Sequence, residues 1–178
     1  AVEAVVENEG QTILSDISED GRYVLFVSDI GQQMNLYEHD RETDTTAQLT
    51  EYRQPVRGGV YAPGADRVAY STNESEHLDN QDVYVAEFER HVDADEHAEL
   101  ADARNLHIGR EGAEAGVRDF GPDGNRLLVS DNSSNKPRAG VYDLTDDAVR
   151  WLTDPDHVES PTTFLPNGED ILATRTRE

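Results

Sequence analysis

Four short apolar runs recur along the chain, and each is placed directly after a turn signal. They are YVLFVS at 23–28, RVAYS at 67–71, RLLVS at 126–130 and DILAT at 170–174. Three of the four follow an Asp-Gly or Asn-Gly pair, which supplies the positive-φ positions that a tight hairpin requires. The runs are apolar on successive residues, not on alternate ones, which predicts strands that are covered on both faces.

Each run is the second of four segments that repeat together. The first segments lie at 11–17, 57–62, 115–120 and 160–165, the third at 35–40, 82–88 and 140–144, and the fourth at 46–50, 103–107 and 149–153. The third segments carry a tyrosine at matching places, Tyr37, Tyr84 and Tyr142. A repeat of about 40–45 residues with four strands is typical of a propeller blade. The sequence therefore predicts an all-β fold, a β-propeller segment of four-stranded antiparallel blades with about three complete blades plus partial ones.

The pattern places the whole chain, 1–178, in a single β-propeller fragment. Its repeats are expected at approximately 8–50, 51–107, 108–153 and 154–178, the last one incomplete, while residues 1–7 align best with an orphan fourth strand. We interpret the chain as a piece of a longer polypeptide whose missing blades lie elsewhere. The alternative is a small ring that the orphan strand and the half blade close together.

The second repeat departs from the others in two ways. Its turn reads PGAD at 63–66, with the glycine shifted, so a hairpin of a different type is expected there. It also carries an acidic insertion at about 89–102, interpreted as an exposed excursion between the third and fourth strands. In the fourth segments Trp151 aligns with Gln48, which predicts a packing role for the indole at the outer rim.

The charge is strongly negative and spread over the whole chain. Asp and Glu number 38 against 15 Lys and Arg, and the formal net charge is -23. Such a surface repels phosphate backbones and anionic headgroups, so neither nucleic acid nor a membrane is an expected partner. An acidic surface that is almost free of lysine is typical of proteins from a saline cytoplasm, where salt screens the self-repulsion. We therefore expect a cytoplasmic protein of a salt-adapted organism, although the sequence leaves export open.

Other classes are excluded by what the sequence lacks. It contains no cysteine, so disulfides, thiol nucleophiles and thiolate metal sites are ruled out. The apolar runs are far shorter than the ~20 residues of a membrane span. No Gly-rich phosphate loop is present, and no cofactor is expected.

The turn, the apolar run ending in serine, the tyrosine strand and the closing Leu-Thr together resemble the repeat of TolB-type propellers and of the prolyl oligopeptidase family. The sequence at 61–88 and the acidic composition look most like the propeller of acylaminoacyl-peptidase or dipeptidyl-aminopeptidase-like enzymes of haloarchaeal type. In that family a C-terminal α/β-hydrolase domain holds the catalytic serine, and the propeller restricts entry to short peptides. No G-x-S-x-G elbow occurs here, so no catalytic residue is assigned.

The resemblance implies a non-catalytic, substrate-gating portion of a serine peptidase. Its expected partners are the missing blades and the hydrolase domain of the parent chain, short peptides and, through exposed blade edges, further copies of itself. The alternative is a TolB-type protein-binding propeller with no hydrolase attached. A third possibility, an enzyme with its site at the propeller centre, would need rings of matching polar residues, which the first segments do not show.

Two acidic stretches contain candidate binding residues. Glu74 and Glu76 follow a second strand, and by resemblance to dipeptidyl peptidases a pair of propeller glutamates grips the amino terminus of the substrate. His91, Asp93 and His97 lie in the insertion and combine imidazole with carboxylate, as zinc sites do. The spacing of the two histidines fits no helical metal motif, so the alternative for this stretch is a solvated acidic loop and no metal site. For Glu74 and Glu76 the alternative is a surface loop.

Overall fold

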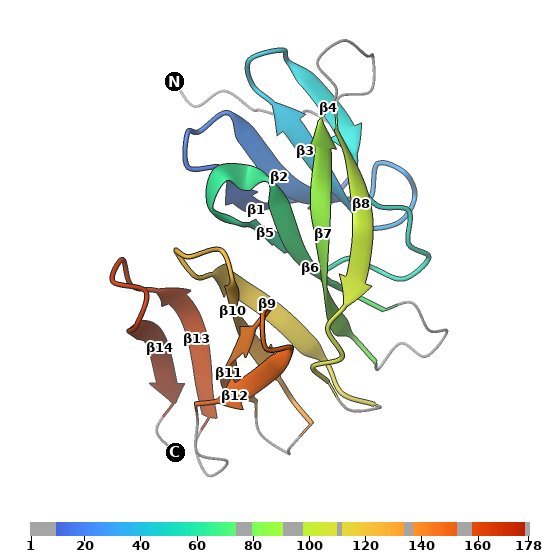
Figure 1. Cartoon of the computed structure of the whole chain (residues 1–178). Coiled ribbons are helices and arrows are strands. Elements are labelled where there is room, and N and C mark those ends of the chain that lie inside the picture. The colour runs from blue at the N-terminus through green and yellow to red at the C-terminus, as the bar shows by residue number, and fades with distance from the viewer. Residues whose placement is uncertain are drawn as a thin grey trace.

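The computed structural model describes residues 10–73, 80–90, 98–109, 112–133, 137–152 and 158–176. These residues form antiparallel sheets that follow one another along the chain (Figure 1). The first sheet contains β1 (Thr12–Ile17), β2 (Tyr23–Ser28), β3 (Asn35–Asp40) and β4 (Thr45–Gln48); the second contains β5 (Gly59–Tyr61), β6 (Arg67–Thr72), β7 (Asp82–Arg90) and β8 (Ala98–Asn105). The third contains β9 (Ala115–Phe120), β10 (Arg126–Asp131), β11 (Arg138–Asp143) and β12 (Ala148–Trp151), and the last pairs β13 (Val158–Phe164) with β14 (Ile171–Thr176).

Within each four-stranded sheet the strands pair in chain order, so every sheet is a simple meander. The first strands of successive sheets contact one another, β1 with β5, β5 with β9 and β9 with β13. The sheets therefore stack as blades around the line of their first strands. This is the all-β arrangement of four-stranded antiparallel blades that the repeats predict.

The hairpins between first and second strands owe their shape to one left-handed residue. Gly21, Gly124 and Gly168 have φ of 71°, 69° and 69°, and each N–H donates to the carbonyl three residues earlier. In the second blade Ala65 holds this position with φ 55°, and unlike in the other hairpins the residue before it, Gly64, is also left-handed with φ 81°, inside the short 3₁₀ turn η1 (Pro63–Ala65). The prediction of a different hairpin there is confirmed.

The second strands supply the core. All residues of β2 after Tyr23 are buried, and Leu127, Leu128 and Val129 of β10 are fully buried. One cluster joins the first and second blades around Leu25, Leu36 and Tyr70; another joins the second and third blades around Val83 and Leu127. Strands that are apolar on successive residues are thus sandwiched between neighbouring blades.

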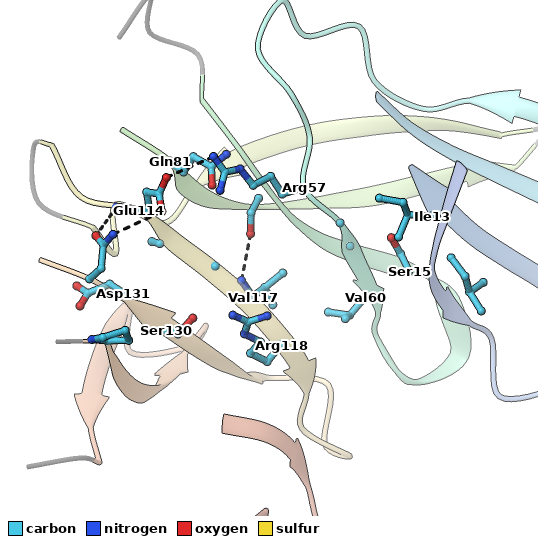
Figure 2. Close-up of a pocket in the computed structure, with 18 residues that line it drawn as sticks. Ile13, Ser15, Arg57, Val60, Gln81, Glu114, Val117, Arg118, Ser130 and Asp131 are labelled. Atoms are coloured by element: carbon cyan, nitrogen blue, oxygen red, sulfur yellow. Dashed lines mark hydrogen bonds and ion pairs between the residues drawn. The ribbon is translucent and has the colours of Figure 1, made fainter. Parts of the chain in front are cut away.

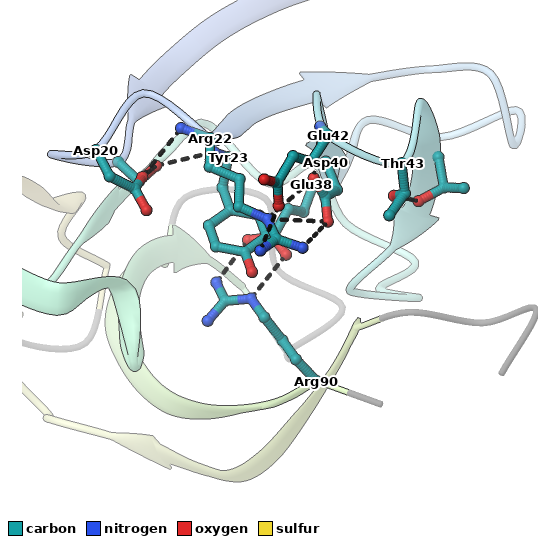
Figure 3. Close-up of polar contacts among 10 residues, drawn as sticks. Asp20, Arg22, Tyr23, Glu38, Asp40, Glu42, Thr43 and Arg90 are labelled. Atoms are coloured by element: carbon teal, nitrogen blue, oxygen red, sulfur yellow. Dashed lines mark hydrogen bonds and ion pairs between the residues drawn. The ribbon is translucent and has the colours of Figure 1, made fainter. Parts of the chain in front are cut away.

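The predicted excursion at 89–102 is wrong for the residues of it that the structure describes. Residues 89–90 extend β7 and residues 98–102 begin β8, so the insertion lengthens a hairpin whose register shifts between Val85 and Glu87. Residues 91–97 lie outside the described residues. The longer hairpin brings Arg90 to the first blade, where its guanidinium donates to Glu38 at 2.8 and 3.1 Å (Figure 3).

This contact is a buried clamp between two blades. The Glu38 side chain is only 3% exposed, and its Oε2 also accepts a hydrogen bond from the Tyr61 hydroxyl at 2.7 Å. Arg90 lies 4.1 Å over the ring of Tyr23 and 4.0 Å over that of Phe88, and it donates to the carbonyl of Ala65. Because Glu38 is buried, it requires these donors.

Tyr142 does not occupy the place of the other third-strand tyrosines. Tyr37 pairs with Phe26 and Tyr84 with Tyr70, but the equivalent residue of the third blade is Gly140, opposite Val129. The indole of Trp151, opposite Gly140, fills the space that the missing ring leaves; a Cβ on Gly140 would lie 2.8 Å from it. The register confirms that Trp151 and Gln48 are equivalent, since Gln48 lies opposite Tyr37.

Candidate functional site: a hollow along the first strands

A cavity of about 540 Å³ lies where the first strands of three blades meet. Its walls are β1, β5 and β9, with the ends of β6 and β10 (Figure 2). Ile13 and Leu14 of β1 and Val60 and Val117 of the other two strands make the apolar part of the lining. The hollow therefore runs along the line around which the blades stack. We call this cavity the central hollow.

Hydrogen bonds across the blades fix the wall opposite β1. The N–H of Val117 donates to the Ser71 hydroxyl at 3.1 Å, and the N–H of Ala115 donates to the carbonyl of Gln81 at 2.8 Å. Both bonds connect the second blade to the first strand of the third. This side of the central hollow is held by backbone groups and not by flexible side chains alone.

Four charged side chains line the central hollow, and they are unequally compensated. Arg57 pairs with Glu114 at 3.3 Å, and Asp131, whose side chain is fully buried, pairs with Arg138 at 2.7 Å. Arg118 is exposed and makes no ion pair or side-chain hydrogen bond with any residue that the structure describes. These four side chains sum to no net charge, but Arg118 is the one among them without a described partner, in a chain whose net charge is -23.

A smaller cavity of about 260 Å³ lies at the other end of the first strands. Asp16 and Asp119 both line it, beside the rings of Tyr61, Phe120 and Phe164. Burial raises the pKa of Asp16, and the nearby Asp119 adds to this effect, while the N–H groups of Tyr61 and Ile17 act in the opposite direction. Both carboxylates already accept backbone N–H groups, so their role here is to join blades.

A hydroxyl, an imidazole and a carboxylate meet on the first blade, but they do not form a catalytic triad. His39 Nδ1 lies 3.0 Å from the Thr46 hydroxyl, and its Nε2 lies 3.8 Å from Asp44. The second distance is too long for a hydrogen bond, and Asp44 is 95% exposed on a turn. The group lies on the outer strands, away from the central hollow, so it has no place to hold a substrate.

The residues expected to bind substrate or metal fall outside the described part. Glu74 and Glu76 lie in the gap at 74–79, and His91, Asp93 and His97 lie in the gap at 91–97. Among the described residues no group of three His, Asp or Glu side chains is arranged to hold a metal ion. Within the same ranges, no helix is long and apolar enough to cross a membrane.

Sequence patterns did not identify the residues that line the central hollow. Arg57 and Arg118 belong to first segments, whose repeats are the most divergent of the four. The sequence does contain one indication of such a residue: Arg118 is a cation within a predicted first strand, in a chain that has few cations. Without the fold, nothing placed that arginine beside residues of β1.

Comparison with solved structures gives strong matches to propellers. TolB from Acinetobacter baumannii superposes with a TM-score of 0.74 at 16% identity, over 95% of this chain and 39% of that one. A puromycin-hydrolyzing peptidase from Mycobacterium tuberculosis gives 0.62 at 14% identity, over 82% of this chain and 24% of that one. A prolyl endopeptidase gives 0.61 at 11% identity, over 87% and 24%.

No family model matches the sequence, and no curated protein matches it significantly. The chain spans between a quarter and two fifths of the length of the three structures that it resembles. At these identities the likeness shows the fold alone: the chain has the β-propeller architecture that TolB and peptidase propeller domains share.

Proposed function

We propose that this chain is the non-catalytic, substrate-gating propeller portion of a serine peptidase that acts on short peptides. The observation that carries the proposal is the central hollow. Its volume of about 540 Å³ suits a few residues of an extended peptide, and it opens along the line of the first strands. Its described lining contains no hydroxyl paired with an imidazole, so it can admit or exclude a peptide but has no means to cleave one.

The fold matches to two peptidases support this proposal, since both contain a propeller of the same architecture. In such an arrangement the propeller selects by size. A chain that enters along the first strands meets walls fixed by the Val117–Ser71 and Ala115–Gln81 hydrogen bonds. Those walls do not widen without breaking contacts between blades.

The test is a series of fluorescent peptides of three to twelve residues. We expect binding of the short members, displacement by unlabelled short peptides, and no release of chromophore from peptidyl substrates. Folded proteins of similar composition should not compete. Turnover that survives repurification, or the absence of binding by every peptide of the series, contradicts the proposal.

A second function is favoured by the extent of one structural match. TolB from Acinetobacter baumannii covers 95% of this chain, more than either peptidase does. A TolB-type propeller would bind a partner protein with no hydrolase attached. The coding sequence that follows codon 178 separates the two functions: a G-x-S-x-G elbow in a hydrolase-like stretch supports the peptidase, whereas a stop after further blades supports the binding module.

A further inference from the structure

One extra residue interrupts the first strand of three blades at the same structural position. In β1 Leu14 pairs with Phe26 and Asp16 with Leu25, which leaves Ser15 without a cross-strand partner. In β9 Val117 and Asp119 pair with successive residues of β10, which leaves Arg118 unpaired in the same way. In β13 the unpaired residue is Thr162. Each bulge carries a polar residue, and a bulge redirects the side chain of its extra residue.

These bulges bring polar groups to the axis that the sequence repeats did not reveal. Ser15 and Arg118 both line the central hollow, from β1 and from β9 (Figure 2). The Arg118 side chain is exposed and makes no ion pair or hydrogen bond with the described residues, so it is available for a ligand. Arg118 is the cation among them, and its charge is the one that no described carboxylate balances.

Beside these polar groups, part of the wall of the central hollow is aliphatic. Ile13 is 48% exposed and Leu14 60% exposed, although both are large aliphatic side chains of a strand. Val60 and Val117 extend the apolar surface on β5 and β9. The lining thus combines one uncompensated guanidinium with an uncovered aliphatic wall.

We propose that the central hollow binds the carboxyl terminus of an extended peptide whose last side chain is apolar. Arg118 takes the terminal carboxylate through two parallel N–H···O bonds, a pairing that its planar guanidinium suits. The terminal side chain packs on Ile13 and Leu14 and removes their exposed surface from water. This proposal rests on the proposed function, in that it names the end of the peptide that the gate recognises.

Charge argues for this occupant over others. A peptide amino terminus would place a second cation beside Arg118. A polyanion such as nucleic acid would meet the field of a chain with net charge -23 along its whole length. A single carboxylate on an otherwise neutral peptide meets that field with one charge only and has a direct contact with Arg118, while Glu114 and Asp131 are already paired with Arg57 and Arg138.

The experiment measures binding of two matched peptides to the whole chain. Acetyl-Ala-Ala-Ala-Leu is used as the free acid and as the carboxyl-terminal amide, each with the same fluorophore near its amino terminus, in competition and in direct titration. The variants are Arg118→Gln, Arg118→Lys and, as a matched control, Arg150→Gln. The control removes the same charge from β12, where Arg150 is exposed and outside the central hollow.

We expect the wild-type chain to bind the acid about tenfold more tightly than the amide, which corresponds to about 1.4 kcal/mol. Arg118→Gln should reduce that ratio to below about twofold while the affinity for the amide stays the same. Arg118→Lys should keep part of the preference for the acid, because lysine keeps the positive charge but lacks the planar guanidinium that donates two parallel hydrogen bonds. Arg150→Gln should keep all of it, and melting curves of all variants should coincide.

Two outcomes overturn this inference and leave the proposed function standing: equal binding of acid and amide by the wild-type chain, or an equal loss of preference in Arg118→Gln and Arg150→Gln. If neither peptide binds at millimolar concentration while the chain is folded, both this inference and the gating function are wrong.

Discussion

Asp16 and Asp119 occupy the same position in two blades, and each bonds to the first strand of the next blade. Both lie opposite the second-strand leucine that follows the left-handed turn, Leu25 or Leu128. Asp16 Oδ2 accepts the N–H of Tyr61 at 2.8 Å, and Asp119 Oδ2 accepts the N–H of Phe164, also at 2.8 Å. The second blade has Val60 at this position, which cannot accept such a hydrogen bond, so the bond from aspartate to the next blade occurs in the first and third blades but not in the second.

Removing the Asp119 carboxylate should loosen the last hairpin from the third blade. Asp119→Ala leaves the N–H of Phe164 without its acceptor, and the hydroxyl of Thr163 loses its shorter bond of 2.6 Å and keeps only the carbonyl of Phe164 at 3.1 Å. We expect a loss of about 1–3 kcal/mol in the free energy of urea unfolding and faster hydrogen exchange of the Phe164 amide. Asp119→Asn should lose less, because the amide oxygen still accepts.

The matched control is Asp146→Ala, at an exposed carboxylate on the β11–β12 turn. Its unfolding free energy should stay within about 0.5 kcal/mol of the wild type. An Asp119→Ala chain with unchanged stability and unchanged Phe164 exchange would contradict the role of this bond.

Breaking the clamp between Glu38 and Arg90 should destabilise the chain strongly from either side. Arg90→Ala leaves a buried carboxylate with only the Tyr61 hydroxyl, and we expect a loss of about 3–5 kcal/mol. The double variant Glu38→Gln/Arg90→Met should recover a large part of that loss, since it removes both charges and keeps the packing on Tyr23. Urea unfolding of the wild type, Glu38→Gln, Arg90→Met and the double variant closes the cycle and gives the coupling free energy.

Additive losses in the cycle would show that the two residues act independently, against the geometry. A suitable control is the Arg104–Asp147 pair, which is also ionic but has exposed side chains, 48% and 66%. Breaking that pair should cost at most about 1 kcal/mol.

The third blade should accept the aromatic arrangement of the first only when two residues change together. Gly140→Tyr alone places a ring where Trp151 and Val149 approach a Cβ to 2.8 and 2.9 Å, and overpacking should lower the melting temperature. Gly140→Tyr with Trp151→Gln copies the Tyr37–Gln48 pair, which is hydrogen-bonded at 3.0 Å. Thermal unfolding followed by circular dichroism should show the double variant more stable than Gly140→Tyr; the opposite order would contradict the equivalence.

Part of the stability should disappear in acid because of Asp40. The hydrogen bond from Arg22 lowers the pKa of Asp40 to about 2 in the folded chain, below the ~3.9 of an unperturbed aspartate (Figure 3). A carboxyl whose pKa is lowered by folding stabilises the fold above its unfolded pKa, and this contribution is lost as the pH falls through the folded value.

The measurement compares wild type with Asp40→Asn in urea between pH 7 and pH 2. The difference in unfolding free energy should be constant above about pH 5 and should shrink from pH 4 towards pH 2. Asp16, whose pKa is raised by burial, has the opposite sign, so Asp16→Asn should not reproduce this profile. A wild-type advantage that persists undiminished at pH 2 would rule out Asp40 as its source.

Salt should stabilise the chain by screening its net charge of -23. We propose that it is adapted to a saline cytoplasm, and we expect its melting temperature to rise from 0.1 M to 3 M KCl. Sodium perchlorate at equal ionic strength separates screening from preferential exclusion of salt. A melting temperature that does not change on desalting would contradict the adaptation.

Local turn chemistry and burial patterns predicted most of the fold. The Asp-Gly turns placed β2 and β10 to within one residue, and the third strand at 35–40 has the predicted bounds. These features depend on neighbours in the sequence, such as the left-handed glycine before each apolar run. A single sequence carries that information directly.

Contacts between blades could not be predicted in the same way. The acidity of the insertion predicts an exposed excursion, whereas Arg90 within it joins Glu38 across 52 residues. The repeats align Tyr142 with the other tyrosines, because the sequence alone does not show the two-residue shift that Gly140 reveals. The bulges at Ser15 and Arg118 could not be predicted, because a bulge changes the pairing of two strands without leaving a recognisable pattern in the sequence repeat.

The bulge at Arg118 also allows this residue to change in evolution without affecting the strand pairing. A residue outside the ladder can be exchanged for another without weakening the pairing of Val117 and Asp119 on either side. Selection could therefore retune what an array of this kind recognises, blade by blade, one position at a time, while the scaffold that presents the residue is inherited unchanged.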